Sequence, residues 1–176
     1  MARMTPDQLY NEYRKGFSGC LWEQHVFDEL INKSKYSLFN DGAKRIKNSG
    51  KGKLSIPYKS VLKFDNNPYN ERQSTGDCVS HGTRNACDLT RAVEIDVHGD
   101  REGWVARGAT EAIYGARGHS GQGMSCARAA DFVSNNGGIV LRKNYSGIAD
   151  FSKYNGNLGA SWGARGLPDK VIDIAN

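Results

Sequence analysis

The chain has 176 residues, of which 38% are hydrophobic and 24% are charged, and its net charge is +5. This length is enough for one domain with its own core, or for a smaller domain with an extension. No apolar stretch is long enough to span a bilayer, and the polar N-terminus lacks the apolar centre of a secretory signal. We therefore expect a protein made in the reducing cytoplasm, with no membrane partner.

Cysteine usage supports the same compartment. The chain has four cysteines, Cys20, Cys78, Cys87 and Cys126, which is sparse for a disulfide scaffold. We expect all four to be reduced thiols.

Residues 1–50 are predicted to form a helical extension. A cap at Thr5 and a proline at the first helical position, Pro6, indicate a helix start, and Gly16 and Gly19 are expected to divide the segment into two helices. The second helix has an apolar stripe that indicates packing against another part of the protein. Its residues are Leu21, Trp22, Val26, Phe27, Leu30 and Ile31.

A basic run, Lys44–Lys53, lies in a predicted linker over residues 40–53. It could bind nucleic acid, although such runs more often only solvate a linker. The Gly-Lys pair in this run is not a phosphate-binding loop. Arg45 stands where the motif needs glycine, and Gly52 where it needs serine or threonine.

The remaining chain, 51–176, is predicted to be one domain. Residues 54–68 are expected to be extended, because two prolines keep the chain out of a helix. A long helix is predicted over 78–97, ending before Gly99. Its apolar positions are Val79, Ala86, Leu89, Val93 and Val97.

Farther along, the pattern predicts a helix over 105–114, a glycine-rich loop over 115–123, a helix over 125–135 and a short strand over 139–141. The inner face of the 125–135 helix is expected to consist of Ala129, Ala130, Phe132 and Val133. Cys87 and Cys126 are expected on buried helix faces. Residues 143–176 are rich in turns and weakly patterned.

Cys78 falls in the first turn of the 78–97 helix, directly after Asp77. Unpaired N–H groups and the helix dipole favour a thiolate there, whereas the neighbouring carboxylate opposes it. Three interpretations stay open: a buried structural thiol, a nucleophile, and, with His81, half of a zinc site without a second ligand pair at a usual spacing. Gln73 could donate its amide to an oxyanion beside the thiol.

Four segments in a fixed order carry a resemblance to a known family. They are LSIPYKSVLKF (54–64), NERQSTGDCVSHGTRNACDLTRAVEI (70–95), GHSGQG (118–123) and CARAADFVSNNGGIVLRKNY (126–145). They resemble, in turn, the extended mature N-terminus, the glutamine–turn–cysteine–helix segment, the substrate-pairing glycine loop and the Gly-Ile helix segment of the papain-like cysteine peptidases. The resemblance covers about residues 54–150.

This resemblance implies an α+β, papain-like fold, represented mainly by its helical half, with a central helix that starts at Cys78. Cys78 would be the nucleophile and Gln73 the oxyanion donor. Gly121 and Gly123 would lie in the loop that pairs with the substrate backbone. The family uses no metal or other cofactor in this reaction, so none is expected.

The match to the family is incomplete. Val79 replaces the usual tryptophan, and the glutamine lies five residues before the cysteine instead of six. Ser74, Thr75 and His119 stand where the family has its disulfide. The base histidine and its orienting asparagine belong to a β-rich half that would follow Asn176.

The histidines of this chain fit the role of the base poorly. His119 belongs to the glycine loop, His25 to the extension and His98 to a helix end. Without an imidazole partner the cysteine of such a pair is not activated.

Two functions follow from this comparison. The first is a papain-like cysteine peptidase domain, acting on a peptide or protein substrate, that is catalytically incomplete because the base histidine is missing. The second is a non-catalytic structural or binding protein that keeps the fold. The degenerate pattern resembles bacteriophage-encoded proteins, so this second role would be in a virion, among other virion proteins.

Overall fold

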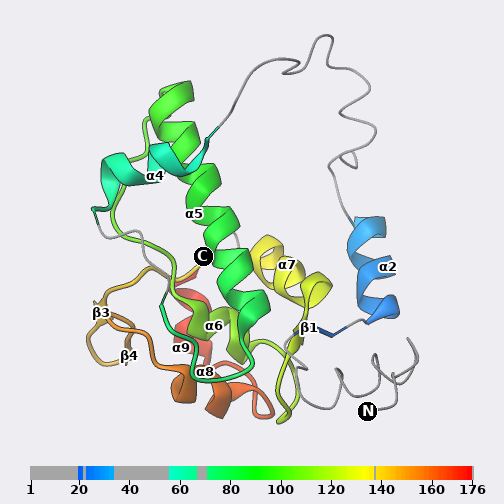
Figure 1. The fold of residues 1–176 in the computed structure, drawn as a ribbon. Helices are drawn as coiled ribbons and strands as arrows, with labels where there is room; N and C mark the ends of the chain where they lie inside the picture. Colours follow the sequence, from blue (N-terminus) through cyan, green and yellow to red (C-terminus); the bar gives the residue numbers. More distant parts are fainter. Residues whose placement is uncertain (1–19, 22, 34–55, 67–70, 137, 176) are drawn as a thin grey trace, which may run out of the picture.

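The computed structural model describes residues 20–21, 23–33, 56–66, 71–136 and 138–175 (Figure 1). This part of the chain is α+β, with helices and two small two-stranded sheets. The helices are α2 (Gln24–Lys33), α4 (Tyr58–Phe64), α5 (Cys78–His98), α6 (Thr110–Gly115), α7 (Cys126–Asn135), α8 (Gly156–Trp162) and α9 (Asp169–Asp173). The strands are β1 (Cys20–Leu21), β2 (Met124–Ser125), β3 (Asn144–Tyr145) and β4 (Ala149–Asp150).

Several sequence predictions lie outside the described residues. They are the helix start at Thr5, the breaks at Gly16 and Gly19, and the linker with its basic run Lys44–Lys53. Within the described part, no helix is both long enough and apolar enough to cross a lipid bilayer.

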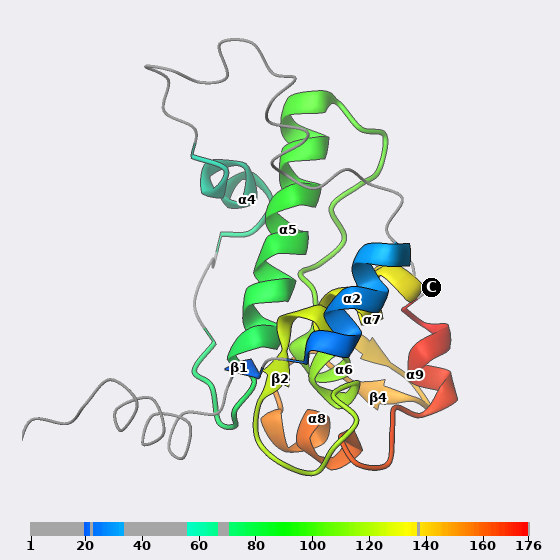
Figure 2. The same cartoon turned by 90° about the vertical axis from the view of Figure 1, so that its right-hand side faces the viewer.

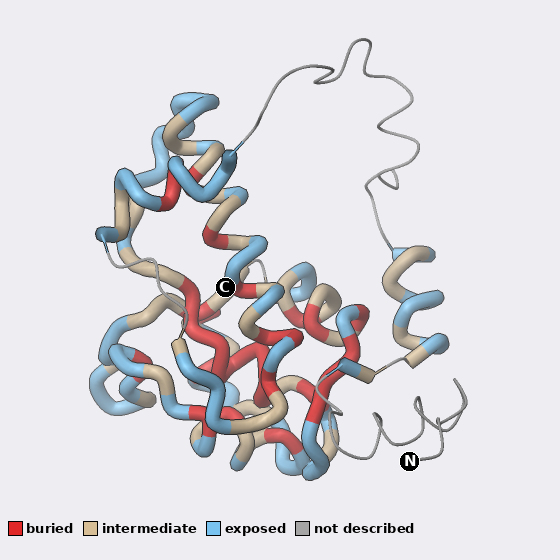
Figure 3. Tube along the Cα trace, in the orientation of Figure 1, coloured by how far each residue is buried: buried red, intermediate tan, exposed pale blue. Residues whose placement is uncertain are grey.

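The long helix α5 is the axis of the fold, and its predicted extent is confirmed. It ends at Gly99, which takes a left-handed conformation with φ 69°, as a helix-ending glycine often does. Figures 1 and 3 show its first half among buried segments, while its last turns stand away from the core beside α4.

The predicted apolar face of α5 is correct only in part. Val79 is buried, but Val97 is 64% exposed, and the charged Arg84 and Asp88 are buried instead. The reason is polar pairing: the Asp88 carboxylate accepts a hydrogen bond of 3.0 Å from the backbone N–H of Gly108. It also lies 3.9 Å from the Arg84 guanidinium. A hydrophobic pattern cannot identify charges that are buried together with their partners.

The segment predicted to be extended contains helix α4, so that prediction is wrong. Pro57 stands at the helix boundary, where a missing N–H costs nothing. Ser60 and Val61 are buried, and Ser60 donates a hydrogen bond of 2.9 Å to Asp96 of α5. The contact with α5 therefore outweighs the local preference for an extended chain.

The helix predicted over 105–114 is shorter in the structure, where α6 begins at Thr110. Ala109 before it is extended, and Val105 is 67% exposed. The N–H of Ala109 donates to the carbonyl of Val140 at 2.7 Å. Leu141 forms an isolated bridge with Gly108, so the strand predicted over 139–141 is reduced to that bridge.

Helix α7 confirms the prediction for residues 125–135. Ser125 is its N-cap, and the hydroxyl accepts a hydrogen bond of 3.2 Å from the N–H of Arg128. Ala129 and Phe132 are buried, as expected. The core that α5, α6 and α7 share with the C-terminal segment contains Val79, Ala112, Ile113, Tyr114, Met124, Ala129, Phe132, Val140, Phe151 and Val171.

The weakly patterned C-terminal segment is folded. It contains the antiparallel pair β3–β4 and the helices α8 and α9. A methyl group at Gly159 of α8 would lie 2.9 Å from the carbonyl oxygen of Glu111 in α6. The two helices therefore meet at their backbones, and this closeness needs glycine.

The N-terminal segment docks on α7 (Figure 2). β1 pairs in parallel with β2, so Leu21 lies in a strand and not in the predicted helix. α2 confirms the helix at Val26 and Phe27, but none of its described side chains is buried. The docking relies instead on Glu23, which bonds Arg128 at 2.6 and 3.0 Å and Ser125 at 2.7 Å.

This docking should weaken in acid. The hydrogen bond from Arg128 is the main cause that lowers the pKa of Glu23 from 4.5 to about 2. Because the folded-state pKa is depressed, the stabilisation is complete above the unfolded value and is lost as the pH falls through the folded value. Hydrogen exchange of the α2 amides should therefore accelerate between about pH 5 and pH 2, after correction for intrinsic rates.

Two variants test this expectation. Glu23→Gln should exchange faster at neutral pH and lose most of this acid dependence. Glu29→Gln changes an exposed carboxylate of α2 whose ion-pair partner among the described residues is Lys33, at 3.5 Å, and should behave as the wild type. Equal acid sensitivity in the wild type and in Glu23→Gln would contradict the assignment to Glu23.

Candidate functional site

Cys78 is the first residue of α5, as predicted, and it is exposed. The interpretation as a buried structural thiol is therefore wrong for this position. The pKa of Cys78 nevertheless lies above its ordinary value. Desolvation is the largest cause, and the charges of Cys20 and Asp77 add to it, against hydrogen bonds from the backbone N–H of Val79 and of Cys78 itself.

The expected lowering of this pKa by the helix start is therefore outweighed. The thiol is protonated at neutral pH in the described structure. A protonated thiol is a poor nucleophile, so Cys78 needs a proton acceptor before it can attack a carbonyl carbon.

Asp77 occupies the N-cap position, but its carboxylate does not cap the helix. It is 1% exposed and accepts hydrogen bonds from the Gln73 amide at 3.1 Å and from the Tyr154 hydroxyl at 2.9 Å. His81 Nε2 lies 3.4 Å from the same carboxylate. These contacts hold the turn before Cys78 together.

Gln73 is the predicted oxyanion donor. It is exposed and lies near Cys78 in sequence, but one of its amide hydrogens is used by Asp77. The structure thus fixes the side chain of Gln73 through the carboxylate of the residue that precedes Cys78.

The glycine loop 118–123 lies against the turn that leads into Cys78. The side-chain oxygen of Gln122 accepts a hydrogen bond of 2.5 Å from the N–H of Gly76 and one of 2.8 Å from the Thr75 hydroxyl. A methyl group at Gly76 would lie 3.0 Å from the backbone nitrogen of Gly123. The expectation that this loop passes close to the cysteine is confirmed.

The two predicted substrate-binding glycines differ in their surroundings. Gly123 is buried, with φ 88°, and leads into β2. Gly121 is exposed, and its carbonyl accepts a hydrogen bond of 3.0 Å from Nε of Arg117. Of the two glycines, Gly121 is therefore the one at the surface.

Tyr154 is the site residue that the sequence did not reveal. Its hydroxyl accepts from the N–H of Ser74 at 3.1 Å and donates to Asp77, and its ring meets the edge of His81 at 5.2 Å between centroids. Burial, with Asp77 adding to it, raises the pKa of Tyr154. No pattern in residues 143–176 marks this tyrosine, because its partners lie about 80 positions earlier.

All four histidines are among the described residues, and none forms a hydrogen bond with Cys78. His81 faces Asp77, His119 lies beside Gly121, and His25 and His98 are exposed. The described residues also contain no group of three or more His, Cys, Asp or Glu side chains arranged for a metal ion. Cys78 and His81 thus gain no further ligand from this part of the chain.

The other cysteines correct one expectation. Cys87 is only partly buried and Cys126 is exposed, so the prediction of two buried helix positions is wrong for Cys126. Cys126 is the first residue of α7, and its sulfur lies 3.8 Å from that of Cys20. All four cysteines are free thiols in this structure.

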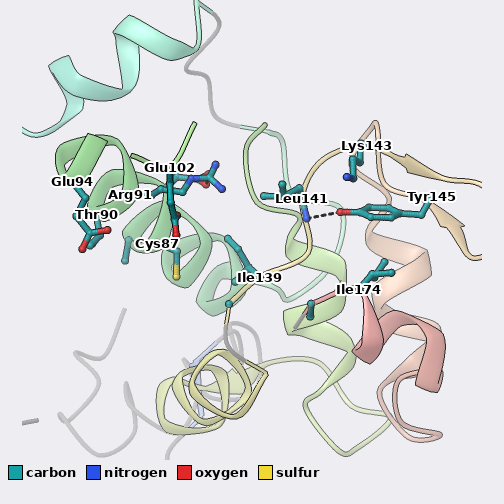
Figure 4. A pocket seen from close by; sticks show the side chains of 14 residues that line it. Cys87, Thr90, Arg91, Glu94, Glu102, Ile139, Leu141, Lys143, Tyr145 and Ile174 are labelled. Atoms are coloured by element: carbon teal, nitrogen blue, oxygen red, sulfur yellow. Dashed lines mark hydrogen bonds and ion pairs between the residues drawn. The ribbon is translucent and has the colours of Figure 1, made fainter. Parts of the chain in front are cut away.

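A separate open pocket of about 860 Å³ lies between α5 and the chain around residues 138–145 (Figure 4). Cys87 and Arg91 extend toward it from α5, while Tyr145 lies on the other side and accepts a hydrogen bond of 3.2 Å from the N–H of Leu141. Cys78 does not line this pocket. It is therefore not the site at the start of α5.

Comparison with known proteins adds no relative to this picture. No protein-family model, curated protein or solved structure matches the chain.

Proposed function

We propose that the chain is a papain-like domain that presents the nucleophile side of a cysteine peptidase site and does not hydrolyse peptides by itself. The observation that carries this proposal is the contact between the glycine loop and the turn before Cys78, made through Gln122. This contact sets the glycine loop 118–123 against the turn that runs from Gln73 to Cys78, so the three elements that carry the resemblance are neighbours. An exposed thiol at a helix start adds support.

The chain's own residues would act as follows once a base is supplied. The base removes the Cys78 proton, and the thiolate attacks the substrate carbonyl carbon. The developing oxyanion accepts hydrogen bonds from the Gln73 amide and from N–H groups at the start of α5. The protonated base then gives its proton to the leaving amine, and water hydrolyses the thioester to release the acid and the thiol.

The missing part is the base. None of the four histidines bonds Cys78, and the raised pKa keeps the thiol protonated. Loss of one member of a nucleophile–base unit costs about as much rate as loss of the whole unit. We therefore expect no measurable turnover by the 176-residue chain.

The test is peptide hydrolysis by the purified chain, with Cys78→Ala as the matched control. Equal background rates for both proteins are expected. Clear turnover that Cys78→Ala abolishes would show that this chain contains a base, and His119→Ala would be the next variant to assay. Activity of a longer product of the same gene, abolished by Cys78→Ala, would establish the peptidase function.

A second candidate function, a non-catalytic structural or binding protein, is favoured by two observations. Gln73 is already bonded to Asp77, and the thiol pKa is raised where a nucleophile needs it lowered. A bacteriophage virion is the setting that the resemblance implies. Absence of hydrolysis in the chain and in every longer product of the gene would decide for this function.

A further inference from the structure

Two cysteines far apart in sequence lie in contact. The sulfur atoms of Cys20 and Cys126 are 3.8 Å apart, and both residues are exposed and free. Cys20 begins β1, and Cys126 is the first residue of α7, directly after β2. The contact therefore joins the N-terminal segment to the domain that carries Cys78.

A backbone pairing and the side-chain contacts of Glu23 hold these two thiols close together. The parallel pairing places Cys20 opposite Met124, two residues before Cys126. Immediately after β1, Glu23 binds Ser125 and Arg128, which flank Cys126 on α7. The approach of the sulfurs thus follows from several contacts and does not depend on one side-chain rotamer.

We propose that Cys20 and Cys126 form a redox-controlled disulfide that fastens the β1–α2 segment to α7. The two sulfurs must approach by about 1.8 Å to reach a bond length near 2.05 Å, which small side-chain rotations at exposed positions supply. No described side chain of α2 is buried, and the described contacts of the segment include the short strand β1 and the ion pair and hydrogen bonds of Glu23. The bridge would add a covalent link to them. The bridge would close a loop of more than a hundred residues.

The oxidant is a low-molecular-weight disulfide such as oxidised glutathione. A thiolate of the pair attacks one glutathione sulfur, which forms a mixed disulfide and releases one glutathione. The second thiolate attacks the protein sulfur of that mixed disulfide and displaces the other glutathione. In sum, two protein thiols are oxidised to one disulfide, and one glutathione disulfide is reduced to two thiols.

The proposal specifies the partner of Cys20. The charge of Cys20 raises the pKa of Cys78, and the charge of Cys78 raises the pKa of Cys126, but the sulfur contact of Cys20 within the described part of the chain is with Cys126. Cys87 takes no part in this group and is the matched control. The bridge does not require Cys78 to be catalytic, so its test is independent of the proposed peptidase function.

Trypsin separates the four cysteines, which makes the assay direct. Cleavage after lysine and arginine places Cys20, Cys78, Cys87 and Cys126 in the peptides 16–33, 73–84, 85–91 and 118–128. The reduced chain is treated with oxidised glutathione, blocked with iodoacetamide and digested without reductant for mass spectrometry. A parallel sample is oxidised in concentrated urea.

The expected product is a monomer that, before blocking, is lighter by about 2 Da than the reduced chain, and whose digest contains peptides 16–33 and 118–128 cross-linked. This pair should exceed every other pair by at least about 10-fold in the folded chain and lose that preference in urea, because folding holds the thiols together. Cys87→Ser should form it equally well, and Cys20→Ser should not. Dithiothreitol should reverse it.

Three outcomes would overturn the proposal. They are glutathione adducts on Cys20 and Cys126 without a cross-link, a dominant bridge from Cys20 to Cys78, or the same distribution of bridges in the folded chain and in urea.

Discussion

Replacement of Arg142 by methionine should lower the free energy of unfolding by about 3–5 kcal/mol, because it leaves a buried carboxylate without its cation. Glu111 is 1% exposed and lies 2.9 Å from the Arg142 guanidinium. The same guanidinium bonds Glu71 at 2.7 Å and the carbonyl of Phe151 at 3.2 Å. Burial opposes the charge of Arg142, but the two carboxylates outweigh it and raise its pKa.

Urea unfolding measures this change, with Arg101→Met as the control at an exposed arginine. The control should lie within about 0.5 kcal/mol of the wild type. If Arg142→Met does not fold, the double variant Arg142→Met with Glu111→Gln keeps the test open, since it removes the unpaired charge together with its partner. A double variant no more stable than Arg142→Met, or a single variant as stable as the wild type, would contradict the importance of this pair.

Replacement of Arg117 by methionine should be almost as costly, at about 3–4 kcal/mol, because it deprives four carbonyl groups, two of them on buried residues, of their donor. Arg117 is 2% exposed. It donates to the carbonyls of Tyr114, Gly121, Gly159 and Ala160, at 2.9 to 3.1 Å. One side chain thus links the end of α6, the glycine loop and α8.

Because of this link, the variant should also loosen the glycine loop. Hydrogen exchange at residues 118–123 should increase in Arg117→Met under conditions where the chain is still folded. Arg165→Met is the matched control, since Arg165 is exposed and bonds only one carbonyl of α8, that of Ser161, at 3.3 to 3.4 Å. Unchanged exchange in the loop would show that Gln122 alone holds it in place.

The best sequence predictions concern α5, α7 and the position of Cys78. Their ends are marked by neighbouring residues: Gly99 stops α5, and the Ser125 hydroxyl caps α7. Signals of this kind act over a few positions, so the sequence is sufficient to read them. Gln73, Cys78 and the glycine loop 118–123 were recognised in the same way, because each is marked by the residues next to it.

Long-range contacts determine the rest of the candidate site. Asp77 looks like a helix cap in the sequence, but its carboxylate binds Tyr154, 77 positions away. Gln122 joins the glycine loop to Gly76 across 46 positions, and Cys20 meets Cys126 across 106. No local pattern encodes such distances.

The sequence also did not predict which charged side chains are buried. A hydrophobic pattern assigns Arg84, Asp88 and Arg142 to the surface, because an isolated charge is too costly to bury. In the folded chain each lies within about 4 Å of an opposite charge, at 3.9 Å for Arg84 and Asp88 and 2.7 Å for Arg142 and Glu71. The sequence therefore identifies α5, α7 and the helix-start position of Cys78 from local signals. The pairing of buried charges, the side chains around Cys78 and the meeting of two thiols arise only when distant segments pack together.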